Sequence, residues 1–522
     1  MNIYLKSFYK YPNSLAAWEK QQQELKAWNA LLGRCSATLT RVGKTLNLID
    51  QQITECIEAS KRDENPTPDI GDSTNSSQKP TPAEIILSLL RFSPDGKCVN
   101  AFETLTSVRV LKLAYESIKS KPGNMVKGVT SETLDGITLE WFEKTSKALL
   151  KEHYRLKPNR RVHIPKPNGK LRPLGIASPR DKIIQQAMNM VMETILEPKF
   201  HDSSHGFRHS RGCHTALRKV RNWRGVPWII EGDIKSFFDM IDHHILADLL
   251  SKHFVERHLF NLYWKFVSAG YIEYNGKKQK FVAADMGVPQ GGILSPLLSN
   301  VILHEFDLYM EKRRLDFIAS SQDHKPMIVN KTYTRLSTLI KKCKDNDLPE
   351  LLRESLRLRK KVRYELPNPN YTRIEYVRYA DDWLVGVWGS KAQAITLKSD
   401  ISLFLQSLKL MLSEEKTLIT NTRRDKVKFL GTLIYRLTPT RGSLSHPTTA
   451  GSIRMNAPLK LIAKRLRDKD FWKPTKVGPK ALGITSWIGW PIKELILRFR
   501  AILNGLFNFY SFVDNRGSLA YI

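Results

Sequence analysis

The chain has 522 residues, of which 83 are Lys or Arg and 51 are Asp or Glu, so its formal net charge at pH 7 is +32. This length is too great for one compact core, and a hydrophobic fraction of 41% is enough for two or three folded domains. The positive charge favours a polyanionic partner, above all nucleic acid, although ribosomal, histone-like and membrane-surface proteins share it.

The cysteine pattern and the hydropathy narrow the class further. The five cysteines are scattered without a C-x-x-C pair, which argues against a disulfide framework or a zinc ribbon and indicates a reducing compartment. No stretch of about 18 apolar residues occurs, so a transmembrane helix is not expected. Met1 to Lys10 shows neither an Arg-rich amphipathic presequence nor a secretory signal.

A polar segment divides the first part of the chain. Residues 14–60 place apolar side chains at spacings of three, four and seven, which predicts an N-terminal helical region within residues 1–60. Residues 61–83 combine Pro, Ser, Asn and Asp with almost no large apolar side chain, which is typical of a flexible linker. Apolar periodicity resumes at Glu84, and residues 105–118 are predicted to form a helix before a basic loop, 119–127.

The next segments alternate between basic and apolar character. Residues 154–180 are rich in Lys, Arg, Pro and Gly, and residues 181–196 have an apolar face that predicts a helix. Residues 311–370 are dominated by Lys and Arg without a clear apolar stripe, which predicts a basic surface insertion. His201, His205, His209 and Cys213 are spaced four residues apart, which could mimic a metal-binding face of a helix. The Ser and Gly residues between them predict a loop instead.

Acidic residues at two predicted strand ends carry the strongest chemical signal. The apolar run from Trp228 to Asp233 predicts a strand that ends at a carboxylate, and residues 374–387 predict a hairpin with Asp381 and Asp382 at its tip. Asp is a poor strand former and adjacent carboxylates repel, so a bound cation would explain the pair, whereas a solvated turn explains Asp-Asp taken alone. Carboxylates on different elements are the ligands that two Mg²⁺ ions about 3.5 to 4 Å apart require. Asp233, Asp381 and Asp382 form such a set.

A resemblance to a known family supports the metal interpretation. Tyr379-Ala-Asp-Asp382 resembles the signature hairpin of reverse transcriptases, and its flanks resemble the branch encoded by group II introns, the intron maturases. Residues 128–136 resemble the N-terminal extension of that branch, and the resemblance covers roughly residues 100–522. Further blocks follow in the family's order: Arg172-Pro-Leu-Gly-Ile176 with Asp181-Lys-Ile-Ile-Gln-Gln-Ala187, His205-Gly-Phe-Arg208, Gly287-Val-Pro-Gln-Gly-Gly-Ile-Leu-Ser-Pro-Leu-Leu-Ser-Asn300, Leu412-Ser-Glu-Glu-Lys-Thr417 and Phe429-Leu-Gly431.

The resemblance implies an α+β, right-hand polymerase fold with fingers, a palm built on an antiparallel sheet and a partial thumb, preceded by the N-terminal helical region. The implied boundaries are 84–228 for the N-terminal extension and fingers, 229–440 for the palm with the basic insertion, 441–490 for a connection and 491–522 for the start of the thumb, or domain X. Phe499 to Tyr510 resembles the opening of the thumb, and the residues up to Ile522 leave room for little more than its first helix. After the start of the thumb, neither a DNA-binding segment nor a Cys- and His-rich endonuclease segment is expected within these 522 residues.

The resemblance also implies the activity of an RNA-directed DNA polymerase with two Mg²⁺ ions as cofactors. A primer 3′-hydroxyl would attack the α-phosphate of a deoxynucleoside triphosphate, templated by intron RNA. The implied partners are this RNA, the primer and dNTPs, with target DNA as an open alternative. No membrane partner is expected, and no oligomeric state is predicted.

Several further residues take roles from the resemblance. Lys416 resembles a lysine that protonates the leaving pyrophosphate, with an exposed loop lysine as the alternative. Phe238 resembles the steric gate that excludes a ribose 2′-hydroxyl, with a core phenylalanine as the alternative. Gln290 resembles the residue that packs on the incoming sugar, and Gly291 would let the backbone approach closely. Tyr379 belongs to the same nucleotide-binding set.

Cationic residues complete the predicted site. Lys170 and Arg172 are predicted to bind the triphosphate, because closing fingers need cations at the β and γ phosphates, and an RNA-facing arginine is the alternative. Asp239 and Asp242 are predicted to be structural, capping or solvating the helix after Asp233. Contacts with RNA are predicted for Arg160, Arg161, Arg208 and Arg211.

Two other functions stay open at this point. One is an RNA-binding splicing cofactor whose polymerase site is idle, and the other is a reverse transcriptase of a retron or defence system. Abundant Lys, Asn, Ile, Phe and Tyr indicate an AT-rich coding genome, which favours a mitochondrially encoded protein, with a bacterial cytoplasmic protein as the alternative.

Overall fold

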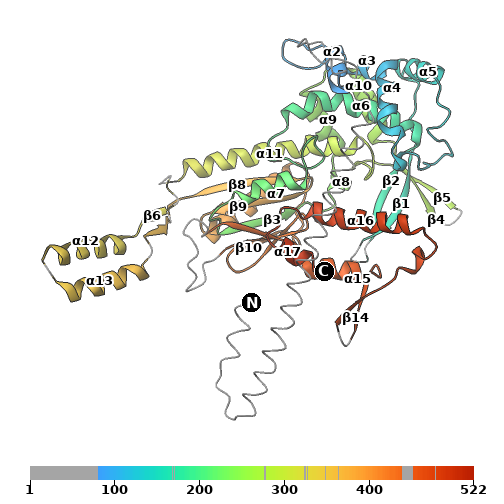
Figure 1. Ribbon diagram of the computed structural model, residues 1–522. Coiled ribbons are helices and arrows are strands. Elements are labelled where there is room, and N and C mark those ends of the chain that lie inside the picture. Colours follow the sequence, from blue (N-terminus) through green and yellow to red (C-terminus); the bar gives the residue numbers. More distant parts are fainter. Residues whose placement is uncertain are drawn as a thin grey trace, which may run out of the picture. The chain divides into compact units, whose positions relative to one another are not determined.

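The computed structural model describes residues 80–521 except 167–168, 170, 276–277, 322–324, 326, 347, 363, 369, 438–450 and 476–477. The predicted N-terminal helical region and most of the predicted linker lie outside the described residues. Helices and mostly antiparallel sheets both occur in the described part, which confirms the α+β class (Figure 1).

Helices dominate the first described segment. α2 (Pro82–Leu89) begins at a capping box, in which Thr81 and Glu84 satisfy each other's backbone N–H groups. The helix predicted for residues 105–118 is divided into α3 (Ala101–Thr106) and α4 (Val108–Lys119), because Ser107 is extended and its side chain caps α4 at Val110. α5 (Leu139–Leu150) follows, and α6 (Pro179–Leu196) confirms the helix predicted for residues 181–196.

Two four-stranded sheets carry the rest of the architecture. The first contains β1 (Asn159–Pro165), β2 (Leu171–Ile176), β4 (Tyr271–Asn275) and β5 (Lys278–Val282) in the order β2-β1-β4-β5, with β1 and β4 parallel. The second, here called the central sheet, has the order β10-β3-β9-β8 and is antiparallel throughout. Its strands are β3 (Trp228–Asp233), β8 (Arg373–Tyr379), β9 (Asp382–Trp388) and β10 (Leu418–Asn421).

The central sheet is buried on both faces, which explains why its strands are apolar at consecutive positions. On one face, Trp383 packs against Phe306 of α11 (Ser295–Ala319), and Phe306 in turn packs against Phe404 of α14 (Lys391–Ser407). The next strand residue, Leu384, points to the opposite face and joins a second cluster with α7 (Cys213–Arg221). That cluster also contains the strands β11 (Val427–Phe429), β12 (Thr432–Arg436) and β13 (Ile453–Asn456).

One hydrophobic core joins the first helices to the central sheet. It runs from Ile86 through α3, α4 and α6 to Trp383 and Leu412. The predicted domain boundaries within this region stay predictions. The remaining elements around this core are α8 (Phe237–Met240), α9 (His243–Ser251) and α10 (Arg257–Val267).

Two further groups of elements complete the described structure, one within residues 327–367 and one within residues 459–519. A ribbon of β6 (Met327–Val329) and β7 (Glu365–Pro367) carries α12 (Lys331–Asp345) and α13 (Pro349–Lys361) in the region predicted as a basic insertion. The C-terminal elements are α15 (Leu459–Arg467), β14 (Trp472–Thr475), β15 (Gly478–Ala481), α16 (Ile492–Phe509) and α17 (Arg516–Leu519). No helix among the described residues is both long enough and apolar enough to cross a membrane.

Candidate active site

Two acidic strand ends meet at one edge of the central sheet. β3 ends at Asp233 and β9 begins at Asp382, and these two residues are direct partners in the antiparallel register. β8 and β9 are joined by the two-residue turn Ala380-Asp381, which confirms the predicted hairpin. Ala380 has φ +56°, a conformation that costs free energy for any residue except glycine. The turn therefore holds Asp381 beside the Asp233–Asp382 pair.

The loop after β9 and α14 brings a cation to the same edge. The N–H of Ser413 donates to the backbone carbonyl of Asp233 over 2.9 Å, which anchors the loop that carries Lys416. The Nζ atom of Lys416 lies 2.6 Å from Oδ2 of Asp233, and this contact raises the pKa of the lysine. Lys416 is thus placed against one of the predicted metal ligands.

The carboxylates at this edge lie close to one another and are partly desolvated, although Asp382 is exposed and Asp233 and Asp381 are half-buried. Desolvation, followed by the negative charge of Asp233, raises the pKa of Asp381. Desolvation together with the charges of Asp381 and Asp233 raises the pKa of Asp382 to about 7. The raised pKa values reflect repulsion between neighbouring carboxylates. Such repulsion is expected at a cation-binding site, because a bound cation would neutralise it.

The donor set fits a divalent metal, although the side chains are not arranged as a finished cage. Among the described residues, no three His, Cys, Asp or Glu side chains converge closely enough to hold a metal ion as they stand. Oxygen donors from three carboxylates at one edge suit Mg²⁺, which keeps several water or substrate oxygens in its coordination shell. A metal at Asp233 would displace the ammonium of Lys416.

Three of the residues predicted to bind the nucleotide lie close to one another: Arg172, Gln290 and Gly291. Arg172 on β2 donates from Nε to Oε1 of Gln290 over 3.0 Å, and Nε2 of Gln290 lies 3.5 Å from Oδ2 of Asp239. Gly291 has φ +101°, and a Cβ at this position would lie 2.7 Å from the side chain of Leu174. The glycine is therefore required by both backbone conformation and space.

A cavity of about 320 Å³ adjoins these contacts. Its lining includes Arg161, Gly175, Asp239, Tyr271 and Gln290. The Arg161 guanidinium lies 3.6 Å from the centre of the Tyr271 ring, so a flat cationic surface forms one wall.

The predicted aromatic residues of the site are placed at its margins. Phe238 on α8 is half-buried, packs edge-on against Phe237, and its carbonyl accepts from the N–H of Val288 over 2.8 Å. This bond links the predicted steric gate to the loop that carries Gln290. Tyr379 ends β8 beside Cys213, and burial raises its pKa to about 12. Lys170 lies outside the described residues.

The arginines predicted to bind RNA fall into two groups. Arg160 and Arg161 lie on β1, where Arg160 donates to the carbonyl of Lys127 over 3.0 Å. Arg211 is partly exposed and pairs with Asp202 at 2.7 Å. Arg208, by contrast, is only 8% exposed, and its guanidinium bonds Glu197 and the carbonyls of His201 and Ser204. This burial favours a structural role for Arg208 over the predicted contact with RNA.

The two other acidic residues of this region can also be compared with their predicted roles. Asp242 accepts hydrogen bonds from the N–H groups of His244 and Ile245, which confirms it as the N-cap of α9. Asp239 faces the cavity, where burial raises its pKa. The segment of residues 201–212 forms turns and no regular helix, as predicted.

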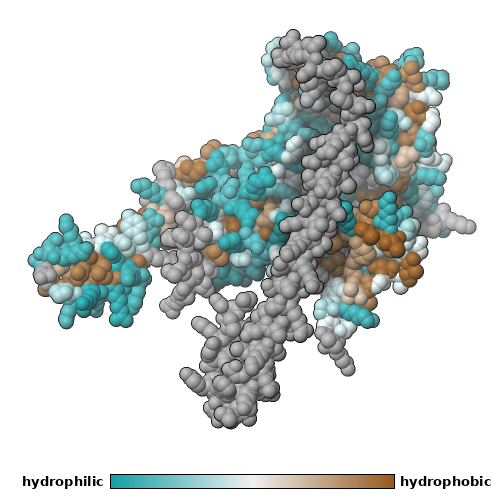
Figure 2. All heavy atoms as spheres, viewed as in Figure 1, coloured by the Kyte–Doolittle hydropathy of each residue, from teal (hydrophilic) through white to brown (hydrophobic). Residues whose placement is uncertain are grey.

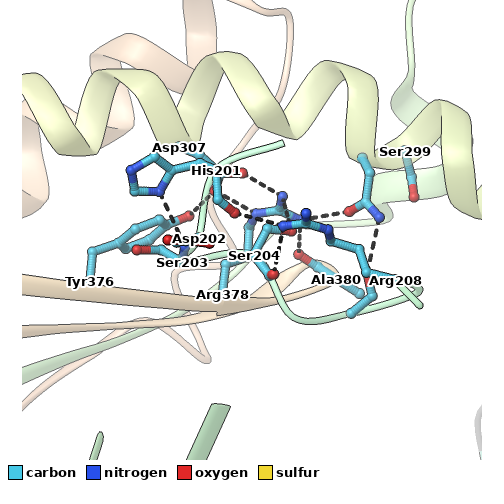
Figure 3. A network of polar contacts seen from close by, with 12 residues as sticks. His201, Asp202, Ser203, Ser204, Arg208, Ser299, Asp307, Tyr376, Arg378 and Ala380 are labelled. Carbon is cyan, nitrogen blue, oxygen red and sulfur yellow. Dashed lines mark hydrogen bonds and ion pairs between the residues drawn. The ribbon is translucent and has the colours of Figure 1, made fainter. Parts of the chain in front are cut away.

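Sequence reasoning missed a fully buried ion pair behind the hairpin turn. Arg378 on β8 and Asp307 on α11 are both 0% exposed and lie 2.6 Å apart (Figure 3). The available signal was an arginine within the apolar strand Tyr376-Val377-Arg378, since a charge in such a strand needs a buried partner. Asp307 could not be paired with it from sequence because 71 positions separate them.

Comparison with known proteins defines the class. Residues 164–434 match the family model described as reverse transcriptase (RNA-dependent DNA polymerase), and residues 450–522 match the model described as type II intron maturase. The first match contains the central sheet and its acidic edge, so the chain carries a reverse transcriptase domain. The second begins before the predicted thumb boundary at 491.

Named relatives narrow the class to one family. The group II intron-encoded protein LtrA of Lactococcus lactis is 36% identical over 432 residues, which cover 78% of this chain and 70% of that protein. An uncharacterized 91 kDa protein in a cob intron of Schizosaccharomyces pombe is 37% identical over 416 residues, 78% of this chain and 50% of that protein. An uncharacterized mitochondrial protein, ymf11, of Marchantia polymorpha is 25% identical over 403 residues, 65% of this chain and 50% of that protein.

The chain belongs to the family of group II intron-encoded reverse transcriptases and maturases. It spans half the length of the Schizosaccharomyces and Marchantia relatives.

Proposed function

We propose that the chain is an RNA-directed DNA polymerase that extends a primer on intron RNA. The observation that carries this proposal is the register of the central sheet, which sets Asp233 opposite Asp382 with Asp381 in the adjoining turn. In this proposal the central sheet is the palm, the β1–β2–β4–β5 sheet with the preceding helices forms the extension and fingers, and α15 to α17 begin the thumb.

The chain's own groups would divide the work of nucleotidyl transfer. When bound, two Mg²⁺ ions would promote deprotonation of the primer 3′-hydroxyl and neutralise charge on the triphosphate. Asp233, Asp381 and Asp382 would hold them, while Arg172 would orient the triphosphate and Phe238 would exclude the 2′-hydroxyl. Lys416 is close enough to Asp233 to lie beside the triphosphate and supply a proton to the leaving pyrophosphate.

Primer extension on an RNA template tests the polymerase proposal. Extension should require Mg²⁺, use dNTPs in preference to rNTPs, and fall to background in the double variant Asp381→Asn, Asp382→Asn. A double variant that extends the primer as well as the parent would refute the site assignment. Glu231→Gln, on the same strand as Asp233 but bonded to Thr420, is the matched control and should keep the activity.

We also propose that the chain assists splicing of its intron. The match of residues 450–522 to the type II intron maturase model supports this second function. Splicing of the intron RNA in vitro, with the parent and with the Asp381→Asn, Asp382→Asn variant, separates the two functions. Splicing that persists in the variant would support an RNA-binding role independent of polymerisation, and splicing that is absent with the parent would refute it.

The α12–α13 pair, here called the basic arm, is proposed as one RNA-binding surface. Between Lys331 and Lys361 the sequence has ten Lys or Arg residues against four Asp or Glu. Figure 2 shows hydrophilic residues along the outer sides of the arm and a hydrophobic strip between its helices. Ile340 and Cys343 of α12 are buried, whereas most of the Lys and Arg side chains of the arm are exposed, as phosphate binding requires.

The family occurs in more than one compartment, since its members include a bacterial protein and one named as mitochondrial. For this chain we propose a mitochondrial, organelle-encoded origin, because its abundant Lys, Asn, Ile, Phe and Tyr indicate an AT-rich coding genome. Detection of its gene within intron sequence of an organelle genome tests this, and a position outside any intron would favour the retron or defence alternative.

A further inference from the structure

We propose that Arg378 is a positioning residue for the active site: its buried guanidinium fixes the carbonyl of Ala380 and so sets the turn that presents Asp381 and Asp382. The inference rests on the proposed polymerase function and deepens it by naming what holds the acidic turn in place. Figure 3 shows Arg378 between helix α11 and the turn, with Asp307 on one side and Ala380 on the other.

Every N–H of the Arg378 guanidinium has an acceptor. Nε and Nη2 bind the two carboxylate oxygens of Asp307 at 2.7 and 2.6 Å. Nη1 donates to Oδ1 of Asn300 and to the carbonyl of Ala380, both at 3.1 Å, and Nη2 also donates to Oγ of Ser204 at 2.7 Å. A guanidinium offers five N–H donors in one rigid plane, so the Ala380 carbonyl is held in a fixed direction relative to α11.

The main chain of Arg378, as distinct from its guanidinium, pairs with the segment that packs against the turn. The N–H of Arg378 donates to the carbonyl of Ser203 at 2.8 Å, and the N–H of His205 donates to the carbonyl of Arg378 at 2.9 Å. Asn300 donates from Nδ2 to the carbonyl of Gly206 at 3.0 Å. Gly206 lies so close to the turn that a Cβ would stand 2.3 Å from the nitrogen of Ala380. The turn is therefore held by the Arg378 side chain, which also bonds Asp307 of α11, and by the close packing of residues 203–206.

The turn needs such support because it is strained. Ala380 has a positive φ that glycine would adopt at little cost, and strained backbone persists only where the surroundings determine it. Loss of the Arg378 contact would let the carbonyl of Ala380 rotate, and this rotation would move the next residue, Asp381. Displacements of about 1 Å in a catalytic group can reduce a rate by about a hundredfold.

A purely structural role makes a different prediction. Removing one member of a buried ion pair leaves an uncompensated charge and destabilises the fold, whereas replacing both members by apolar residues of similar volume is often neutral. The double variant Arg378→Met, Asp307→Leu should therefore recover stability while the Ala380 carbonyl still lacks its donor. Arg378→Lys keeps the charge beside Asp307 but cannot reach Ala380 at the same time.

Tyr376 provides the matched control. Its hydroxyl donates to Oδ1 of Asp307 at 2.9 Å, so it belongs to the same buried network but does not touch the turn. Tyr376→Phe removes one hydrogen bond of the network and should lower the unfolding temperature without affecting the acidic residues.

The test compares the parent, Arg378→Lys, Tyr376→Phe and Arg378→Met, Asp307→Leu at a temperature at which circular dichroism shows each to be folded. Mn²⁺ binding to the protein alone is titrated by electron paramagnetic resonance, and kcat and the KM for dNTP are measured by primer extension. Both Arg378 variants should bind Mn²⁺ about tenfold more weakly and lose kcat by about tenfold or more, with KM changed less than about threefold. Tyr376→Phe should match the parent in all three.

Parent-like Mn²⁺ affinity and kcat in either folded Arg378 variant would overturn the proposal, as would equal losses in Tyr376→Phe. The Mn²⁺ titration separates this outcome from failure of the proposed function. A parent that binds Mn²⁺ but does not extend a primer would refute the polymerase, and the comparison of metal affinities would still decide the role of Arg378.

Discussion

The ammonium of Lys416 and the carboxylate of Asp233 are 2.6 Å apart, although 183 positions separate them in the sequence. The contact gives the acidic edge a cation that belongs to the chain itself. A metal ion that coordinates Asp233 has to compete with this ammonium, so the lysine affects both metal affinity and, in the proposed mechanism, the departure of pyrophosphate.

Lys416→Ala should separate these two effects. Without the competing ammonium, the Mg²⁺ concentration for half-maximal primer extension should fall, while the maximal rate should fall by about 10²-fold because a proton donor is lost. Rates measured over a range of Mg²⁺ concentrations report both quantities. Lys409→Ala is the control, since Lys409 makes a similar exposed 2.6 Å contact with Asp242. An unchanged maximal rate in Lys416→Ala would exclude the proton-donor role.

Phe238→Ala should relax the choice of sugar. If the half-buried ring blocks the 2′-hydroxyl, its removal should raise rNTP incorporation relative to dNTP incorporation by at least about tenfold, which corresponds to about 1.4 kcal/mol of discrimination. The ratio of the two values of kcat/KM is measured within one protein preparation, so a general loss of stability cancels. A ratio equal to that of the parent would make Phe238 a core residue only.

Gly206→Ala should destabilise the protein, because the new Cβ would stand 2.3 Å from the backbone nitrogen of Ala380. A backbone atom in this position cannot move aside cheaply, and we expect a loss of about 1–3 kcal/mol in the free energy of unfolding. Chemical unfolding monitored by circular dichroism measures it. Gly212→Ala is the control, since nothing lies within 4 Å of a Cβ there. Equal stability of the two variants would contradict the close packing.

His205 should make the stability depend on pH. Its pKa is lowered from 6.5 to about 4 by desolvation and by the charges of four neighbouring cations, Lys219, Arg211, Arg208 and Arg378. The unfolded state therefore binds the proton more readily between pH 4 and pH 6.5, so this group's contribution to stability is present above pH 6.5 and is lost as the pH falls. The loss between pH 7 and pH 5 should be about 2 kcal/mol.

Urea unfolding at pH 7 and pH 5 tests the His205 prediction against His205→Asn, which keeps a polar atom near Nδ1 and its bond to Thr215. The parent should lose more stability than the variant on acidification. The comparison is needed because Asp382, with a raised pKa, contributes in the opposite direction. Equal losses in both proteins would show that His205 titrates normally.

Shortening the basic arm should weaken RNA binding without removing the proposed active site. β6 and β7 pair as an antiparallel ribbon, so a short Gly-Ser turn can replace residues 331–361. The affinity for intron RNA should fall and the slope of its logarithm against salt concentration should become shallower, because fewer counterions are released. Filter binding at several salt concentrations measures both. An unchanged slope would show that the arm does not contact phosphates.

The acidic strand ends could be predicted from the sequence because they depend on local patterns. An apolar run ending at Asp233 and two β-rich arms around Ala380 identify one strand and one hairpin, and both were placed within a residue or two. The break of the first long helix at Ser107 was missed, because the apolar periodicity continues across it and only the capping geometry reveals it.

The support of the site could not be predicted in the same way. Arg378 is neutralised by Asp307 on a helix that the sequence places in a different segment, and nothing local indicates that the two meet. The β1–β2 hairpin was likewise hidden in a stretch whose Lys, Arg, Pro and Gly content is typical of a loop. The Arg378–Asp307 ion pair and the β1–β2 hairpin both depend on which segments pair in the folded chain, and local sequence patterns do not show this.

The hydrophobic core that starts at Ile86 and ends at Leu412 also limits how the protein can be shortened. Leu105, Val110 and Leu111 have no exposed surface and contribute to that core from α3 and α4. A shortened chain that starts at β1 would leave their packing partners on α6 open to water and would be prone to aggregation. A trimmed version intended to remain soluble should therefore begin no later than Thr81, the residue that caps α2.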